Sequence, residues 1–218
     1  SDNVSHELRI PLSILRGQTE LSLRRTRSND EYIGILKSNL EEIERMEMIV
    51  ERLLFLSRAE QGEVPLNSIQ INFNALLEDI YFKFLVPAQE KGVNIMLDKK
   101  SQVFVIGDEV LLREVLLNLV QIALTYTERG GEIRLASEAD EENVRISVSD
   151  SGCGIPDEEI PRIFDRFYQV NKSRSGKGSG LGLSICQWIT QAHQGKIMVL
   201  SRVGHGSQFT LCLPIPKD

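Results

Sequence analysis

A histidine near the start of the chain, His6, is followed directly by a glutamate, Glu7. A neutral imidazole is a nucleophile near pH 7, and a neighbouring carboxylate can hold the other ring nitrogen protonated and stabilise the charge that develops on attack. The pair could therefore accept a group in a covalent transfer. Taken alone, the same pair is more often a surface histidine beside a surface glutamate, so its interpretation depends on the rest of the chain.

Two glycine clusters lie in the second half of the chain, at residues 150–154 and 176–183. In the first, glycines let the backbone approach a ligand, and Asp150 can accept a hydrogen bond from an exocyclic amine such as that of adenine. A tight turn after a strand needs the same residues. The second opens a helix, where free amides and the helix dipole can bind phosphate. A flexible loop before a helix explains it equally well.

An aromatic and basic segment separates the two clusters. Residues 163–168 include two phenylalanines, and residues 171–175 are polar and carry Lys172 and Arg174. An aromatic anchor followed by a basic segment suits a lid over phosphates. A charged run in a loop is more often simply solvated.

The first element that must position these residues is a helix, expected over residues 2–25. Leu8, Leu12 and Leu15 recur at spacings of four and three and form one stripe, so the histidine and glutamate lie off that stripe and face water.

A second helix is expected from a cap at Ser28 to about Gln61. Its apolar residues step by threes and fours, as in a coiled coil. They are Ile33, Leu36, Leu40, Ile43, Met46, Val50 and Leu53. Because such a hairpin has too little core to fold alone, we expect two copies to pair as a four-helix bundle.

Short strands and helices alternate after the hairpin. Strands are expected at residues 69–71, 93–97, 103–106, 133–137, 144–148, 197–200 and 208–213, and helices at 73–90, 107–127 and 182–192. This order predicts a two-layer α/β sandwich, and with the hairpin the fold class is α+β.

The composition of the chain argues against some classes of function. The 218 residues are 41% hydrophobic and carry a net charge of −6, which suits ordinary cores and argues against a nucleic-acid surface. No apolar run approaches the roughly 20 residues that span a bilayer, and no signal peptide is evident. Cys153, Cys186 and Cys212 have no paired metal-ligand spacing, so we expect buried free thiols in a reducing compartment.

Taken together, the motifs resemble those of the sensor histidine kinases of two-component signalling. The shared features are Ser-His-Glu-Leu-Arg-x-Pro-Leu at 5–12, Asn118 and Tyr126 on one helix, Asp-x-Gly-x-Gly at 150–154, Phe164 with Phe167, and Gly-x-Gly-Leu-Gly-Leu at 178–183. The resemblance covers essentially the whole chain. It implies a dimerisation and histidine-phosphotransfer hairpin over residues 1–62, a linker over 63–68, and an ATP-binding catalytic domain over 69–218 whose fold is shared with Hsp90-type ATPases.

The resemblance also implies roles. His6 would accept the γ-phosphoryl group of ATP with Glu7 as the base, and would pass it to an aspartate of a response-regulator receiver domain docked on the hairpin. Adenine would contact Tyr126, Asp150, Gly152 and Gly154, and the phosphates would lie near Arg166, Lys172, Gly178, Gly180, Leu181 and Gly182. Asn118 would ligate Mg²⁺.

The resemblance also implies an oligomeric state and a cellular location. We expect a homodimer in the cytoplasm, with no membrane contact by these residues, in a parent protein anchored in the inner membrane of a bacterium.

Three positions depart from the family pattern. Ile122 replaces a second asparagine that binds magnesium, Thr125 replaces a phosphate-facing lysine, and Ile10 replaces a threonine or asparagine that positions water for dephosphorylation. Isoleucine cannot ligate a hard cation, so we expect a loss of ~100-fold or more in phosphorylation. If the alignment is displaced by one residue, Gln121 is the ligand; it lies about 100° around the helix from Ile122, whereas Asn118 and Ile122 share a face.

Two alternatives stay open. One is a degenerate or engineered-inactive kinase that acts as a nucleotide-binding dimeric module. The other is an Hsp90- or MutL-like ATPase, which does not explain residues 5–12. His193 and His205 are expected to be structural, with a cationic His193 complementing a helix dipole.

Overall fold

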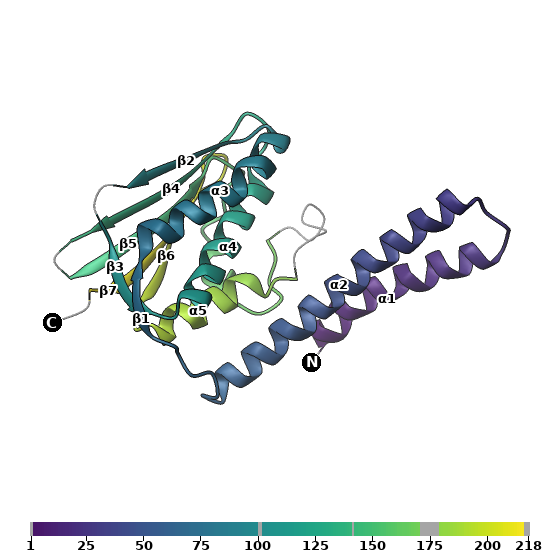
Figure 1. Cartoon of the computed structure of the whole chain (residues 1–218), viewed down its shortest axis with the longest axis horizontal. Helices are drawn as coiled ribbons and strands as arrows, with labels where there is room; N and C mark the ends of the chain where they lie inside the picture. The colour runs from purple at the N-terminus through teal and green to yellow at the C-terminus, as the bar shows by residue number, and fades with distance from the viewer. Residues whose placement is uncertain (1, 100–101, 141, 171–178, 216–218) are drawn as a thin grey trace. The chain divides into compact units, whose positions relative to one another are not determined.

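The structure is a computed structural model that describes residues 2–99, 102–140, 142–170 and 179–215 (Figure 1). The chain divides into two compact units, Ser1–Val64 and Pro65–Asp218. Every predicted helix and strand is present, with bounds within two residues of those expected from the sequence. The predicted α+β architecture of a helical hairpin followed by an α/β sandwich is thus confirmed.

The first unit is a hairpin of helix α1 (Asp2–Leu23) and helix α2 (Asn29–Glu60). The predicted cap at Ser28 is a full capping box. The Glu31 N–H donates to Ser28 Oγ at 3.2 Å, and the Ser28 N–H donates to Glu31 Oε2 at 2.9 Å. The reciprocal bonds satisfy two backbone donors and fix where α2 begins.

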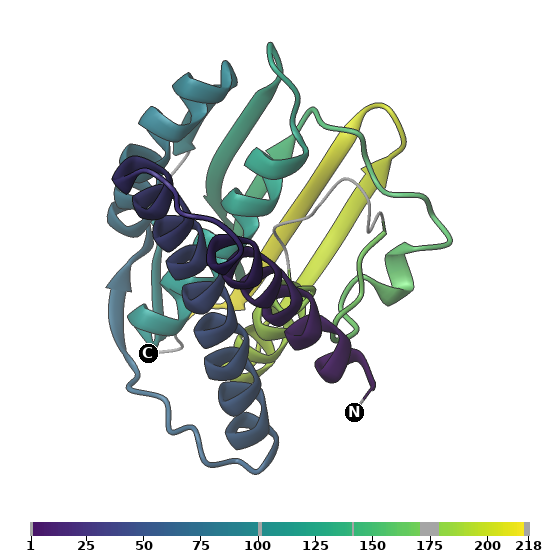
Figure 2. The same ribbon diagram turned by 90° about the vertical axis from the view of Figure 1, so that its right-hand side faces the viewer.

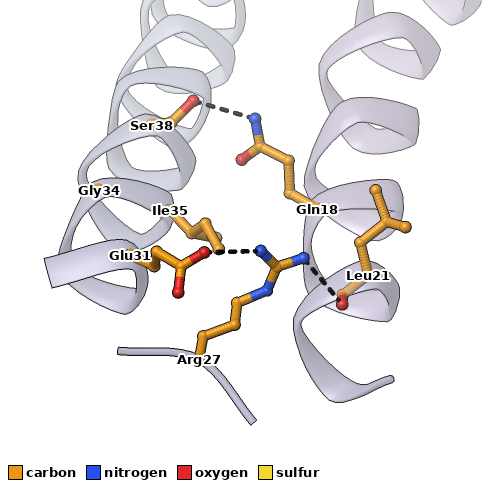
Figure 3. A pocket seen from close by; sticks show the side chains of 7 residues that line it. All are labelled: Gln18, Leu21, Arg27, Glu31, Gly34, Ile35 and Ser38. Atoms are coloured by element: carbon orange, nitrogen blue, oxygen red, sulfur yellow. Dashed lines mark hydrogen bonds and ion pairs between the residues drawn. The ribbon is translucent and has the colours of Figure 1, made fainter. Parts of the chain in front are cut away.

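Near its turn the hairpin contains a cavity of about 330 Å³, shown in Figure 3. Gln18 Nε2 donates to Ser38 Oγ at 3.0 Å across the two helices, and Arg27 bonds the Leu21 carbonyl oxygen at 3.2 Å. The residues that line the cavity are Gln18, Leu21, Arg27, Glu31, Gly34, Ile35 and Ser38. None of them is a predicted site residue.

The predicted apolar stripe of α2 is largely open to solvent in the single chain. Its exposed members follow one another by threes and fours, apart from one gap of seven, so they form a single row. These are Ile33, Leu36, Leu40, Ile43 and Val50. In contrast, the stripe residues Met46 and Leu53 are half-buried. A row of large exposed apolar side chains is the signature of an interaction surface.

The second unit contains a five-stranded sheet in the order β2-β4-β5-β7-β6. The strands are β2 (Asn94–Lys99), β4 (Glu132–Ala139), β5 (Asn143–Asp150), β6 (Lys196–Arg202) and β7 (Gly206–Pro214). β2 pairs with β4 in parallel, and the remaining pairs are antiparallel. Figure 2 shows β6 and β7 as two adjacent yellow strands. A separate antiparallel ribbon joins β1 (Ile69–Asn72) to β3 (Phe104–Gly107).

Three helices form the second layer of this unit: α3 (Phe73–Lys91), α4 (Glu109–Tyr126) and α5 (Gly182–Ala192). Buried residues alternate along β4 and β5, as expected for a sheet with one covered face. Leu116 and Val120 of α4 and Ile133 and Ile146 of the sheet are completely buried or nearly so. This core fixes α4 relative to the end of β5, where the first glycine cluster begins.

The expectation that all three cysteines are buried is wrong for Cys153. Cys186 and Cys212 are buried, whereas Cys153 is exposed. Cys153 lies in the turn after β5, where it is not part of a strand or helix that packs on the core. Among the described helices, none combines the length and the apolar character that crossing a bilayer requires.

Candidate active site

Asp150 is the last residue of β5, the middle strand of the sheet. Its Oδ1 accepts a hydrogen bond from the Gly152 N–H at 2.8 Å. Partial burial raises the pKa of the Asp150 carboxyl, and the N–H groups of Gly152 and Ser207 offset this only in part. The end of β5 thus presents a half-buried carboxyl group that is oriented by backbone donors and can accept a further hydrogen bond.

The glycines after Asp150 are required by the packing of the protein itself. A Cβ atom at Gly152 would lie 2.5 Å from the carbonyl oxygen of Tyr126. Gly154 has φ +70°, and a Cβ atom there would overlap the carbonyl oxygen of Arg202. The turn therefore lies directly against the end of α4 and brings Asp150 close to Tyr126 in space. Contact of either glycine with a ligand stays a prediction.

The second glycine cluster meets α4 at Asn118. A Cβ atom at Gly182 would lie 3.1 Å from Asn118 Oδ1. Leu181, predicted to contact ATP, has a fully buried side chain, so a contact with a ligand would have to come from its backbone. Asn118 therefore faces the N-terminus of α5, where backbone N–H groups favour an anion.

The aromatic segment is joined to this same cluster. Phe167 has φ +63°, and its N–H donates to the Gly180 carbonyl oxygen at 2.9 Å. Gly180 has φ +66°, and a Cβ atom there would clash with the Phe167 backbone. Arg162 lies over the ring of Tyr168, 4.5 Å from the ring centre. Arg166 is exposed, and the predicted residues Lys172 and Gly178 lie outside the described residues.

Lys91, the last residue of α3, bonds the C-terminal end of α4, a contact that no sequence motif predicts. Lys91 Nζ donates to the carbonyl oxygens of Leu124 and Thr125 at 2.5 and 2.8 Å. An ammonium group here satisfies the last carbonyl groups of the helix and complements its dipole. Lys91 therefore holds the helix end that carries Tyr126.

The side chains near Asn118 offer few oxygen ligands for magnesium. Ile122, one turn on from Asn118, has no oxygen to offer, and the Thr125 hydroxyl donates to the Gln121 carbonyl at 2.7 Å. Mg²⁺ requires oxygen ligands in near-ideal octahedral geometry. No group of three His, Cys, Asp or Glu side chains in the described parts of the chain could hold a metal.

On α1, His6 is exposed and Glu7 is half-buried. Ile10, one helical turn after His6, is 44% exposed. The histidine is thus accessible to a reaction partner, and the position next to it on the helix surface is apolar.

Two different protein families match this chain, one over the helical hairpin and one over the second unit. Residues 1–62 match the family described as "His Kinase A (phospho-acceptor) domain", and residues 107–217 match "Histidine kinase-, DNA gyrase B-, and HSP90-like ATPase". Sensor histidine kinase CusS of Escherichia coli K12 is 36% identical over 217 residues, which is 98% of this chain and 45% of CusS.

This chain belongs to the sensor histidine kinases. The resemblance inferred from its motifs is confirmed. Sensor histidine kinase RppB of Synechocystis is also 36% identical, over 98% of this chain and 48% of RppB. The chain thus spans about half the length of the curated histidine kinases that it matches.

Solved histidine kinase structures have the same fold. Histidine kinase AdeS of Acinetobacter baumannii gives a TM-score of 0.81 at 27% identity, with 97% of this chain and 98% of AdeS covered. Histidine kinase ThkA, solved in complex with the response regulator protein TrrA, gives a TM-score of 0.79 at 28% identity, with 98% of this chain and 60% of that chain covered.

Proposed function

We propose that this chain is the core of a histidine protein kinase that phosphorylates His6 from ATP and transfers the phosphoryl group to an aspartate of a response regulator. The observation that carries the proposal is the presence, in one chain, of an exposed histidine followed by a half-buried glutamate on α1 and of an oriented carboxyl group with glycine turns at the end of β5. An Hsp90- or MutL-like ATPase would need the second feature but not the first.

The proposed reaction is a phosphoryl transfer to nitrogen. A ring nitrogen of His6 forms a bond to the γ-phosphorus as the bond to the β,γ-bridging oxygen breaks, and ADP leaves. Glu7, the next residue on α1, orients the ring and takes up the proton from the other ring nitrogen. The N–P bond is of high energy, so the group can pass on to an aspartate carboxylate.

Nucleotide binding is assigned to the second unit, residues 65–218. In this proposal adenine contacts Asp150, Gly152, Gly154 and Tyr126. The phosphates lie near Asn118, Arg166, Lys172, Gly178, Gly180 and Gly182, with the backbone of Leu181. The proximity of Asp150 to the end of α4, and of Asn118 to Gly182, supports one continuous site.

Magnesium would neutralise phosphate charge when bound, and of the family's two asparagine positions this chain retains Asn118 alone. Because Ile122 offers no ligand, we propose that the kinase activity is weakened. The alternative is a degenerate kinase that binds nucleotide and signals as a dimer without phosphorylating itself.

The proposed partners are a second copy of the chain and a response-regulator receiver domain. The exposed apolar row on α2 supports pairing of two hairpins into a four-helix bundle. The ThkA–TrrA complex supports docking of a receiver domain. From family membership we also propose a cytoplasmic location within a longer protein anchored in the inner membrane of a bacterium. Nucleic acid is not a proposed partner.

The proposal is tested by incubating the chain with ATP labelled at the γ-phosphate, with and without magnesium. Label that is lost in acid and stable in base identifies phosphohistidine and supports the kinase. Nucleotide binding without label supports the degenerate kinase instead. If the chain neither binds ATP nor takes up label, the proposal is wrong.

Replacing Asp150 with asparagine should weaken ATP binding while stabilising the fold. Loss of a hydrogen bond to a charged group lowers affinity about 10- to 100-fold. The raised pKa means that the folded chain holds the carboxyl proton more tightly than the unfolded chain. Ionisation therefore costs stability above the folded pKa, and no cost remains below the unfolded pKa. Calorimetric titration and melting curves at pH 7 and at low pH measure both effects.

The matched control is Asp140→Asn, at a carboxylate in the β4–β5 turn whose pKa is lowered by the N–H groups of Glu142 and Asn143. This variant should bind ATP normally and lose stability at pH 7. Unchanged ATP affinity in Asp150→Asn would contradict the assignment of Asp150 to adenine.

We expect Ile10→Thr to give the chain phosphatase activity toward a phosphorylated receiver domain, an activity that the unchanged chain should lack. A hydroxyl one turn from His6 can orient a water molecule toward an aspartyl phosphate, whereas a hydrocarbon cannot. The decay of a phosphorylated receiver domain should accelerate by about 10-fold or more, with Ile10→Val as the control. Rapid decay already in the presence of the unchanged chain would show that the prediction is wrong.

A further inference from the structure

His193, just after the end of α5, is buried, and each nitrogen of its ring lies within hydrogen-bond distance of a backbone group. Its Nδ1 lies 2.7 Å from the Ile189 carbonyl oxygen, and its Nε2 lies 2.9 Å from the backbone nitrogen of Asp108. A backbone N–H can only donate, so Nε2 accepts and carries no proton, and Nδ1 carries the ring proton. The ring is therefore neutral, and the expectation of a cationic His193 complementing the helix dipole is wrong.

Asp108, the partner of His193, caps the N-terminus of α4. Its Oδ1 accepts from the Leu111 N–H at 3.1 Å, and its Oδ2 accepts from the Asn67 N–H at 3.0 Å. Gly107 leaves the space that the ring occupies, since a Cβ atom there would lie 2.6 Å from His193 Cδ2. The contact thus joins the C-terminal end of α5 to the first turn of α4.

The two helices meet again at the other end of α5, where Gly182 lies against Asn118. Between these points Cys186 Sγ lies 3.8 Å from the Val115 carbonyl oxygen, a weak hydrogen bond. The directional bond that the Asp108 N–H donates to His193 Nε2 therefore fixes how far α5 can slide along α4. This distance in turn sets the position of the α5 N-terminus relative to Asn118.

We propose that His193 is a positioning residue for the phosphate end of the nucleotide site. This inference rests on the proposed ATP binding. The neutral imidazole holds Gly182 and Asn118 in register, so its loss should affect the β- and γ-phosphates and leave the adenine contacts at Asp150 unchanged. Those contacts depend on β5 and the C-terminal end of α4. Within the described residues the ring of His193 bonds instead to the backbone of Asp108 and Ile189.

The test compares ATP with AMP, which lacks the β- and γ-phosphates, in calorimetric titrations. We expect His193→Ala to weaken ATP binding about 10-fold, because without the bond to Asp108 the α5 N-terminus is no longer held in register with Asn118. AMP binding should change less than about twofold. His193→Gln, whose amide oxygen can accept from Asp108, should restore most of the ATP affinity. His205→Gln, at an exposed turn, is the control and should change neither.

A merely structural role for His193 would weaken both nucleotides alike, and that result, or equal ATP affinity in all variants, would overturn the proposal. An independent measurement needs no nucleotide. The amide NMR signal of Gly182 should shift in His193→Ala and return toward its original position in His193→Gln. An unshifted signal in His193→Ala overturns the positioning role. Failure of the unchanged chain to bind ATP would contradict the proposed function. The Gly182 signal would still show whether His193 positions the N-terminus of α5.

Discussion

Replacing His6 with glutamine should abolish the uptake of labelled phosphate by the chain. Glutamine preserves the helix and a polar side chain but has no nucleophilic nitrogen near pH 7. His6 is exposed on α1, so the exchange should leave both the fold and the ATP affinity unchanged. Acid-labile label, measured after separation of the protein from ATP, should fall to background.

Two controls make this result specific. His205→Gln removes another exposed histidine and should retain full label. Glu7→Gln retains the nucleophile but lacks the carboxylate, so labelling should slow by about 100-fold or more while still reaching His6. Acid-labile label that persists in His6→Gln would place the phosphoryl acceptor elsewhere in the chain.

Replacing Ile122 with asparagine should accelerate labelling of His6 by about 100-fold. The new amide oxygen lies one helical turn from Asn118 and completes a second ligand position for magnesium. Charge neutralisation at transferring phosphates lowers the barrier by several kcal/mol, and a 100-fold change in rate corresponds to about 2.7 kcal/mol. Initial rates of labelling at saturating ATP measure the effect.

Calorimetry with and without magnesium shows whether the ligand is responsible. ATP should bind Ile122→Asn more tightly when magnesium is present, while the unchanged chain shows little difference. Gln121→Ala is the matched variant for a displaced alignment. If magnesium tightens binding equally in the unchanged chain and in Ile122→Asn, and Gln121→Ala removes this effect, then Gln121 supplies the ligand and the kinase is not weakened by Ile122.

The helices, the strands and the family motifs of this protein could all be predicted from the sequence alone. Helix periods, the Ser28 cap and the alternation along β4 and β5 are local properties, because each depends on residues a few positions apart. The same holds for the glycine clusters and for residues 5–12, which carried the resemblance to sensor histidine kinases. The order of the strands in the sheet could not be predicted from such local patterns. The parallel pairing of β2 with β4, and the separate ribbon of β1 and β3, depend on contacts across many intervening residues.

Tertiary structure decided which atoms each motif residue meets. Gly152 is a glycine because the Tyr126 carbonyl oxygen occupies the place of its side chain, and Leu181 is a core residue within a motif that is predicted to bind the nucleotide. The protonation of His193 followed from a backbone N–H that lies 85 positions away in the chain. A sequence pattern specifies residue types and local geometry, whereas burial and hydrogen-bond partners arise only when distant segments pack together, and these set the charge and the role of each side chain.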